Sequence, residues 1–357
     1  ASMFYTGLAQ KIGGVVVKMC GTGENSLMFG LMMVGTVLSS CLSNTGTAAC
    51  LLPVALGICA AAKIPASRQL MPLAFACGWG GIITMVGTPP NIIAVGAMTS
   101  AGLEPFGFFE FAWIGIPVSI AGMLYMMFVG KYLLPKVDLS ADQEIEQEIE
   151  AASTSSTKQI ISGVILALVI ITMAVGIPGV SLEIAAITGA LVCVLTGCLT
   201  EKQAYASIDW VTIFLFAGMM PVSNAMDKTG AGKLIAEWAV SLMGGSPTPI
   251  IMTSVLFIIS CTLTQFMSNT AAAALLAPVG VAISQQLGAS PKAVLMAIGV
   301  AASCAFATPV GTPPCTLVLG PGGYKFMDYV KVGVPLVILC FIVSIIVIPM
   351  VWPFFPG

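Results

Sequence analysis

One phrase occurs twice in this chain. Ser43-Asn44-Thr45 is followed further along by Gly87-Thr88-Pro89-Pro90, and Ser268-Asn269-Thr270 is followed by Gly311-Thr312-Pro313-Pro314. The two Ser-Asn-Thr phrases start 225 positions apart, and the two Gly-Thr-Pro-Pro phrases start 224 apart. Separated motifs that recur at one interval indicate a tandem repeat of a single unit. We therefore expect two copies of that unit, with function where their motifs can meet.

Composition places both copies in a lipid bilayer. Hydrophobic residues make up 58% of the chain and charged residues 8%, which leaves too little polar surface for a water-soluble protein of this length. The net charge of −2 and the lack of a basic cluster argue against nucleic acid as a partner. Histidine, the most common general base and metal ligand, is absent. These features predict an integral, multi-pass protein of the cytoplasmic membrane that is not an enzyme.

Each Ser-Asn-Thr phrase interrupts an apolar stretch, at 27–62 in the first copy and at 249–287 in the second. The halves of the first stretch have roughly 16 residues each, fewer than the ~20 that cross the hydrocarbon core of a bilayer. We therefore predict two re-entrant helical hairpins with polar tips near the membrane midplane. Two full spans in each stretch would fit the distribution of charges equally well.

Each Gly-Thr-Pro-Pro phrase interrupts a further apolar stretch, at 68–100 and at 292–319. Adjacent prolines remove two backbone donors and disfavour helix at the preceding residue, so a helix must break at each phrase. Because unpaired backbone cannot face lipid, the unwound residues have to line a cavity within the protein. Each copy thus supplies one hairpin tip and one broken helix to an all-α fold.

The remaining segments complete the two copies around a linker. The first copy, 1–134, adds an interfacial helix at 1–26 and a span at 111–134. An acidic run marks a cytoplasmic linker at 135–159. The second copy, 160–357, adds spans at 160–177, 182–199, 211–224 and 332–351 and an interfacial stretch at 225–247. Since the second copy has more residues ahead of its interfacial stretch than the first, we expect segments that belong before Ala1 to be missing.

The charges predict how the copies are oriented. If a hairpin returns to the side from which it enters, Lys63 and Arg68 share a face with Lys131 and Lys136, whereas the loop 101–110 on the other face carries acids and no basic residue. The positive-inside rule makes the basic face cytoplasmic. The second hairpin then enters from the opposite face, as in the inverted-topology repeats of secondary transporters.

The four phrases contain no charged side chain, and offer hydroxyls, amides, unwound backbone and helix ends. Helix N-termini attract anions, and unwound carbonyls suit a bare monovalent cation. A site without fixed counter-charge can take a dianion into the membrane only with accompanying cations, because burying unpaired charge is prohibitive. A single Ser-Asn-Thr is usually a helix kink or an interhelical hydrogen-bonding contact, but the repetition favours a site for a small anion and sodium.

These paired motifs resemble those of the divalent anion/sodium symporter family, the INDY-type di- and tricarboxylate and sulfate transporters. The resemblance covers nearly the whole chain. It implies a homodimer in which each protomer has a scaffold domain and a transport domain that moves as an elevator. It also implies Na⁺ as the transported coupling ion.

By the same similarity, substrate contacts come from both phrases of each copy. They are Ser43, Asn44, Thr45, Thr88, Ser268, Asn269, Thr270 and Thr312. The similarity implies that a first sodium ion is held by Ser39, Ser43, Asn44 and Gly87, and a second by Thr264, Met267, Asn269 and Gly311. One departure is Cys315, which stands where the first copy has Asn91, so a side-chain contact shared by both copies is not expected there.

The leading prediction is sodium-coupled symport of a C4 dicarboxylate such as succinate or malate. A sulfate or other oxyanion symporter, a dicarboxylate exchanger and an anion channel remain alternatives. An intramembrane enzyme would need a nucleophile with its base, or a set of metal ligands, and the motifs contain neither.

Overall fold

The computed structural model describes residues 2–9, 11–12, 14–15, 23–137, 155–175, 182–208 and 248–355, with scattered positions between 210 and 241. The described residues form helices joined by short connections. Most of the predicted linker at 135–159, of the span at 211–224 and of the interfacial stretch at 225–247 lies outside them.

The first copy contains a helical hairpin and a broken helix. Its elements are α3 (Glu24–Cys41), α4 (Asn44–Ala62), the 3₁₀ turn η1 (Ala66–Arg68), α5 (Leu70–Gly80) and α6 (Pro89–Ser100). The second copy repeats the hairpin and the broken helix in the same order. Its elements are α14 (Pro249–Thr264), α15 (Asn269–Leu287), α16 (Pro291–Ser303) and α17 (Pro313–Leu319).

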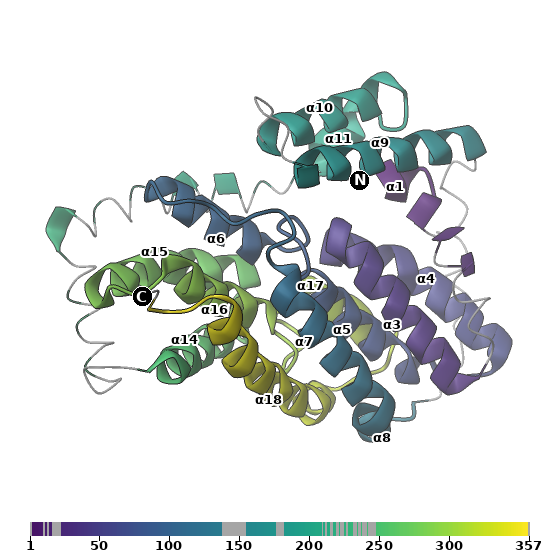
Figure 1. Ribbon diagram of the computed structural model, residues 1–357. Coiled ribbons are helices and arrows are strands. Elements are labelled where there is room, and N and C mark those ends of the chain that lie inside the picture. Colours follow the sequence, from purple (N-terminus) through teal and green to yellow (C-terminus); the bar gives the residue numbers. More distant parts are fainter. Residues whose placement is uncertain are drawn as a thin grey trace.

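Two long apolar helices and a small separate layer complete the described fold. The elements are α1 (Ser2–Tyr5), α7 (Ala112–Tyr125), the π-helical turn η2 (Met126–Gly130), α8 (Lys131–Leu133), α9 (Ser156–Val175), α10 (Leu182–Leu195), α11 (Glu201–Ala206) and α18 (Phe326–Val351). α7 and α18 pack on each other between the helices of the two copies, and α9, α10 and α11 lie together to one side with α1 against α9 (Figure 1).

The broken helices unwind before their prolines. α5 ends at Gly80 and residues 81–88 are irregular, while α16 ends at Ser303 and residues 304–312 are irregular. In each copy the two prolines are the first two residues of the next helix. Proline suits these positions because the first N–H groups of a helix have no partner within it. The prolines therefore set where α6 and α17 begin.

Three of the four hairpin legs are longer than the roughly 16 residues predicted. α3 has 18 residues and α4 has 19, and α14 has 16 and α15 has 19. At 1.5 Å per residue, the longer legs extend about 28 Å, close to the thickness of the hydrocarbon core. These lengths suit both re-entrant and spanning hairpins, so re-entrance stays a prediction.

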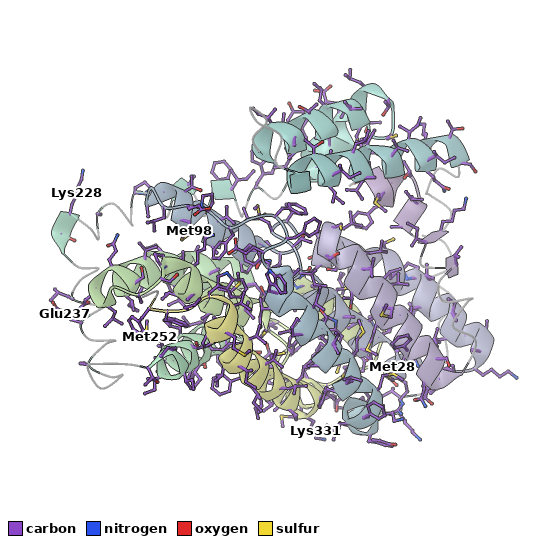
Figure 2. The ribbon with its side chains drawn as sticks, in the orientation of Figure 1. Met28, Met98, Lys228, Glu237, Met252 and Lys331 are labelled. Atoms are coloured by element: carbon purple, nitrogen blue, oxygen red, sulfur yellow. The ribbon has the colours of Figure 1, made fainter. Side chains whose placement is uncertain are left out.

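The two copies are packed into one core. Within each copy the first leg of the hairpin lies on the first half of the broken helix, α3 on α5 and α14 on α16. Between copies, α4 lies on α17 and α15 lies on α6. Met28 in α3 and Met252 in α14, 224 positions apart, are both fully buried at equivalent places (Figure 2). This reciprocal packing brings each broken helix against both hairpins.

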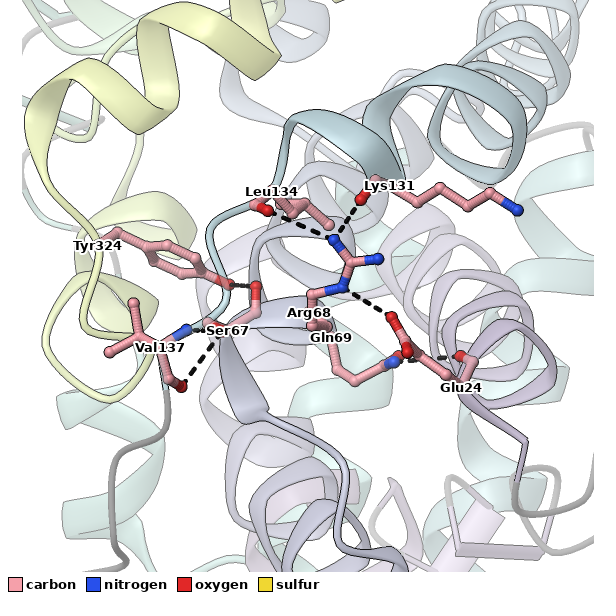
Figure 3. A network of polar contacts seen from close by, with 8 residues as sticks. All are labelled: Glu24, Ser67, Arg68, Gln69, Lys131, Leu134, Val137 and Tyr324. Atoms are coloured by element: carbon pink, nitrogen blue, oxygen red, sulfur yellow. Dashed lines mark hydrogen bonds and ion pairs between the residues drawn. The ribbon is translucent and has the colours of Figure 1, made fainter.

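Polar contacts fix one end of the α7–α18 pair, shown in Figure 3. The buried Arg68 donates from Nε to Glu24 Oε1 at 2.6 Å. Its Nη1 donates to the carbonyl oxygen of Lys131 and, at 3.3 Å, to that of Leu134. The start of α3, the end of η1 and the end of α8 therefore meet at this end.

The start of α18 joins the same end through Tyr324. The Tyr324 hydroxyl donates to Ser67 O at 2.7 Å (Figure 3). It also accepts from the Met71 N–H at 2.8 Å. Burial raises the pKa of the Tyr324 phenol, so it remains protonated and can keep both bonds. One phenol thereby connects the α17–α18 loop of the second copy to the start of α5 in the first.

A second polar group fixes the opposite end. Glu110, just before α7, lies 3.3 Å from Lys292 Nζ and accepts from Trp352 Nε1 at 2.8 Å. The N–H of Ser290 donates to Phe354 O at 2.6 Å. Since Trp352 and Phe354 follow α18, this group joins the start of α7, the end of α18 and the turn from α15 to α16.

The two hairpins therefore open in opposite directions. The first opens at the Arg68 end, because α3 begins there and α4 leads back to η1. The second opens at the Glu110 end, because α15 leads to Ser290. This is the inverted arrangement of secondary-transporter repeats. Arg68 and Lys131 share one end and the loop 101–110 lies at the other, as the charge pattern predicts; which end is cytoplasmic stays a prediction.

The outer surfaces are apolar, as a bilayer requires. Along α18 the side chains of Val334, Ile338, Ile342, Ile346 and Met350 form an exposed stripe at four-residue spacing. Five described helical segments are long and apolar enough to cross a membrane. They are Asn44–Ala62, Ala112–Leu133, Ser156–Met173, Asn269–Leu287 and Phe326–Val351. The fold is that of a helical, polytopic membrane protein.

Replacing Arg68 with alanine is expected to destabilise the protein by about 2 kcal/mol, because it leaves two carbonyl oxygens and the partly exposed Glu24 without the donor that the buried guanidinium supplies. The thermal unfolding midpoint of the detergent-purified protein measures this change. Lys202→Ala, on the exposed surface of α11, is the control and should leave the midpoint unchanged. Equal midpoints for the two variants would contradict a structural role for the Arg68 group.

Candidate functional site

The tip of the first hairpin meets its own broken helix through Asn44. One end of the buried Asn44 amide lies 2.6 Å from Ser39 Oγ and 3.0 Å from the carbonyl oxygens of both Cys77 and Gly87. Ser39 Oγ in turn donates to Cys77 O at 2.7 Å. Three oxygen atoms from α3, α5 and the irregular segment 81–88 thus converge on one point.

The second copy repeats this geometry. One end of the Asn269 amide lies 2.8 Å from Thr264 Oγ1, 2.9 Å from Gly311 O and 3.3 Å from Ala302 O. Thr264 Oγ1 donates to Ala302 O at 2.7 Å. Each of these four residues is 224 or 225 positions after its counterpart in the first copy. We call the two sets the oxygen clusters: Ser39, Asn44, Cys77 and Gly87 in one copy, and Thr264, Asn269, Ala302 and Gly311 in the other.

The orientation of each asparagine amide decides what its cluster can do. With Nδ2 toward the three oxygens, the two N–H groups of the amide are shared among the three acceptors, and this orientation satisfies the described hydrogen-bonding groups. With Oδ1 turned toward them, the cluster hydroxyl can donate to Oδ1, at 2.6 Å from Ser39 and 2.8 Å from Thr264, and a cation can bind among the four oxygens. Carbonyl, hydroxyl and amide oxygens are the ligands that hard cations such as sodium prefer. Each oxygen cluster can therefore exist as a closed hydrogen-bonded set or as a cation site.

The serine of each Ser-Asn-Thr phrase caps the second hairpin leg. Ser43 Oγ accepts from the Gly46 N–H at 3.1 Å, and Ser268 Oγ accepts from the Ala271 N–H at 3.2 Å. Both serines are exposed, so each hydroxyl can still donate its proton to a ligand. The N-termini of the 19-residue helices α4 and α15 add partial positive charge at the same places. Both tips can bind an anion.

The four threonines of the phrases differ in exposure. Thr88 and Thr312 are buried and precede α6 and α17, and the Thr88 Oγ1 atom has no hydrogen-bond partner among the described residues. Thr45 is exposed on the first tip, and Thr270 is buried on the second. An unpartnered, buried hydroxyl at Thr88 is free to bind a ligand. Met267, half-buried in the second tip, donates its N–H to Leu263 O, and its predicted part in sodium binding stays a prediction.

The motifs alone do not reveal two kinds of residue at this site. Cys77 and Ala302 contribute only their carbonyl oxygens, which any residue type would supply. Thr84 and Thr308 each donate to the carbonyl of the residue after the cluster hydroxyl, at Ser40 and Gln265. Thr84 and Thr308 are 224 positions apart, so aligning the copies residue by residue would have found this pair.

The fold and this paired site define a class of protein, the multi-pass membrane transporters with inverted repeats. The family model described as citrate transporter (CitMHS) matches residues 1–288 and, in an overlapping match, 176–355. The chain belongs to this family, and with it to the di- and tricarboxylate transporters that its motifs resemble. It is an integral protein of the cytoplasmic membrane and a transporter rather than an enzyme.

Three similar proteins illustrate the relationship. An uncharacterised transporter of Haemophilus influenzae is 33% identical over 336 residues, 88% of this chain and 70% of that protein. The sodium-dependent dicarboxylate transporter SdcS of Staphylococcus saprophyticus is 24% identical over 370 residues, 93% of this chain and 70% of that protein. The crystal structure of the Alcanivorax borkumensis YdaH transporter matches with a TM-score of 0.68 at 18% identity, covering 99% of this chain and 85% of that one, which shows a shared fold.

Proposed function

We propose that this protein is a sodium-coupled symporter of a small divalent anion, a C4 dicarboxylate such as succinate or malate. The observation that carries the proposal is the pair of matching oxygen clusters, one at each hairpin tip. Each cluster offers a monovalent cation four oxygens in a buried setting without a charged side chain. Two sodium ions would balance the charge of one dianion.

In this proposal the substrate carboxylates lie at the exposed sides of the two tips. The hydroxyls of Ser43 and Ser268 and the helix N-termini donate to them, with Thr45, Thr270, Thr88 and Thr312 nearby. The sodium-dependent dicarboxylate transport in the name of the Staphylococcus relatives supports both the substrate class and the ion. The homodimer and the elevator movement stay predictions from the resemblance.

Sodium and substrate would bind cooperatively through the asparagines. When sodium enters a cluster, the amide of Asn44 or Asn269 rotates so that Oδ1 faces the ion and Nδ2 faces away. The freed N–H donors can then reach an anion beside the tip. A cluster without sodium keeps its amide donors turned inward, which lowers the affinity for the anion.

Ligand-induced thermal stabilisation of the purified protein tests this proposal. Succinate at about 100 times its Kd should raise the unfolding free energy by about 2.7 kcal/mol in sodium chloride, and should do nothing in potassium or choline chloride. Sulfate and citrate are run in parallel to identify the anion. Equal stabilisation by succinate with and without sodium would contradict the coupled site, and stabilisation by sulfate alone would replace the dicarboxylate with an oxyanion.

A further inference from the structure

The irregular segments 81–88 and 304–312 carry the glycine carbonyls of the two oxygen clusters. They lack the hydrogen bonds of a helix, yet both are almost entirely buried. Buried backbone groups need partners, and their positions remain defined only while those partners hold them. Backbone contacts supply part of these bonds. In each copy one side-chain amide supplies further ones, but the two amides come from different places.

In the first copy the amide belongs to Asn91 in α6. Its Nδ2 donates to Thr84 O at 2.8 Å and lies 3.4 Å from the carbonyl oxygens of both Gly81 and Ile82. These carbonyls precede Gly87, whose oxygen belongs to the cluster. The fully buried Asn91 thus binds the segment from its C-terminal side.

In the second copy the amide belongs to Gln265, at the end of α14. Its Nε2 donates to Cys304 O at 3.0 Å, and its Oε1 accepts from the Ala307 N–H at 3.0 Å. Gln265 directly follows Thr264, the hydroxyl of the second cluster. Here the amide comes from the hairpin and not from the following helix, although Thr316 Oγ1 in α17 also donates to Pro309 O of the segment, at 2.7 Å.

Each copy has a small residue where the other has its amide. Ser40 stands at the place of Gln265, and among the described residues its hydroxyl bonds to Val37 O at 2.8 Å and to Cys41 Sγ at 3.5 Å, both nearby in the chain. Cys315 stands at the place of Asn91 and is fully buried. The equivalence of Ser40 and Gln265 is supported by Thr84 and Thr308, which donate to their respective carbonyl oxygens.

We propose that Asn91 and Gln265 are equivalent positioning residues, each of which holds the irregular segment that supplies carbonyl oxygen to one sodium site. The ion-binding part rests on the proposed function, whereas the exchange of amide positions rests on the hydrogen bonds alone. The role of Asn91 is therefore structural support of the site. The second copy keeps this support although it has Cys315 in place of the asparagine, because Gln265 supplies the amide there.

This proposal predicts that an asparagine on α17, at the position equivalent to Asn91, can hold the irregular segment of the second copy in place of Gln265. Gln265→Ser removes the amide from the hairpin, and Cys315→Asn introduces one on α17. The double change keeps the number of buried amides the same and shortens that amide by a methylene group, so it disturbs the core less than removing the amide alone. Either single change disturbs both the volume and the hydrogen bonds.

The test measures sodium-dependent succinate uptake in proteoliposomes for Gln265→Ser, Cys315→Asn, the double variant and wild type. Gln265→Ser should raise the sodium concentration for half-maximal uptake about tenfold, since the segment that carries Gly311 loses both of its bonds to the amide, and the double variant should recover most of this shift. Gln286→Ser, on the exposed face of α15, is the matched control and should behave as wild type. The thermal midpoint of each variant in detergent is recorded as a readout independent of transport.

Unchanged sodium dependence in Gln265→Ser would overturn the proposal. The proposal would also be overturned if the double variant showed no recovery of uptake or thermal midpoint relative to Gln265→Ser, while Cys315→Asn alone folded normally. If wild-type uptake proves independent of sodium, the proposed function fails, and the midpoints still decide the positioning role. A midpoint restored in the double variant would then support the exchange of amide positions, and one that stays low would refute it.

Discussion

Replacing Asn44 or Asn269 with alanine is expected to lower sodium-coupled uptake roughly a hundredfold while the protein still inserts and folds. Each amide contacts three oxygen atoms of its cluster, at 2.6 to 3.0 Å for Asn44 and 2.8 to 3.3 Å for Asn269. Losing these contacts at about 1 kcal/mol each, in a site with few other donors, accounts for the size of the effect. Initial uptake rates normalised to reconstituted protein measure it.

The control for this prediction is Asn25→Ala, which removes an exposed amide at the start of α3, far along the chain from either tip. This variant should transport as wild type does. Wild-type uptake by both Asn44→Ala and Asn269→Ala would show that the oxygen clusters take no part in transport.

A second large effect is expected from Gly87→Ala and Gly311→Ala. A Cβ atom at Gly87 would lie 2.4 Å from Gly81 O, and one at Gly311 would lie 2.6 Å from Thr264 O. Because both obstacles are backbone atoms, the irregular segment must shift, and the cluster oxygen moves with it. We expect uptake to fall at least tenfold and stability to fall by about 1–3 kcal/mol.

Gly57→Ala provides the comparison, since outside the local backbone of α4 no atom of the described residues lies within 4 Å of a Cβ added at this position. Alanine favours helix over glycine by about 1 kcal/mol, so this variant should be as active as wild type and slightly more stable. Uptake and thermal midpoints of the three variants are measured together. Normal transport by Gly87→Ala and Gly311→Ala would show that the glycine carbonyls have no role.

Much of the fold could be predicted because the sequence contains two copies of the same structural unit, each with the same motifs. The apolar composition requires helices that satisfy their own backbone groups, and the repeated phrases mark the same interruptions in both copies. The opposite directions of the two hairpins follow from the charges around Arg68 and in the loop 101–110, and the contacts of Arg68 and Glu110 show them directly. The family, the helical membrane fold and the transporter class are all confirmed.

Other features could not be predicted because residue identity does not encode them. The helix unwinds at residue 81, ahead of Gly87-Thr88-Pro89-Pro90, and the unwound segment bonds to Asn91 and to Phe108 O. Carbonyl ligands such as Cys77 O leave no trace in the sequence. The mismatch of Asn91 with Cys315 suggested only imperfect symmetry, since the compensating Gln265 lies 50 positions earlier and is close only in the folded protein.

Uptake of labelled succinate into proteoliposomes, with and without an inward sodium gradient, tests the central claim most directly. The proposed symport predicts that succinate accumulates above its external concentration when sodium is directed inward, and that uptake saturates with both sodium and succinate. Accumulation should cease when potassium replaces sodium on both sides. Sodium-independent counterflow would instead identify an exchanger, linear and unsaturable flux would identify a channel, and either result would contradict sodium-coupled transport through the two oxygen clusters.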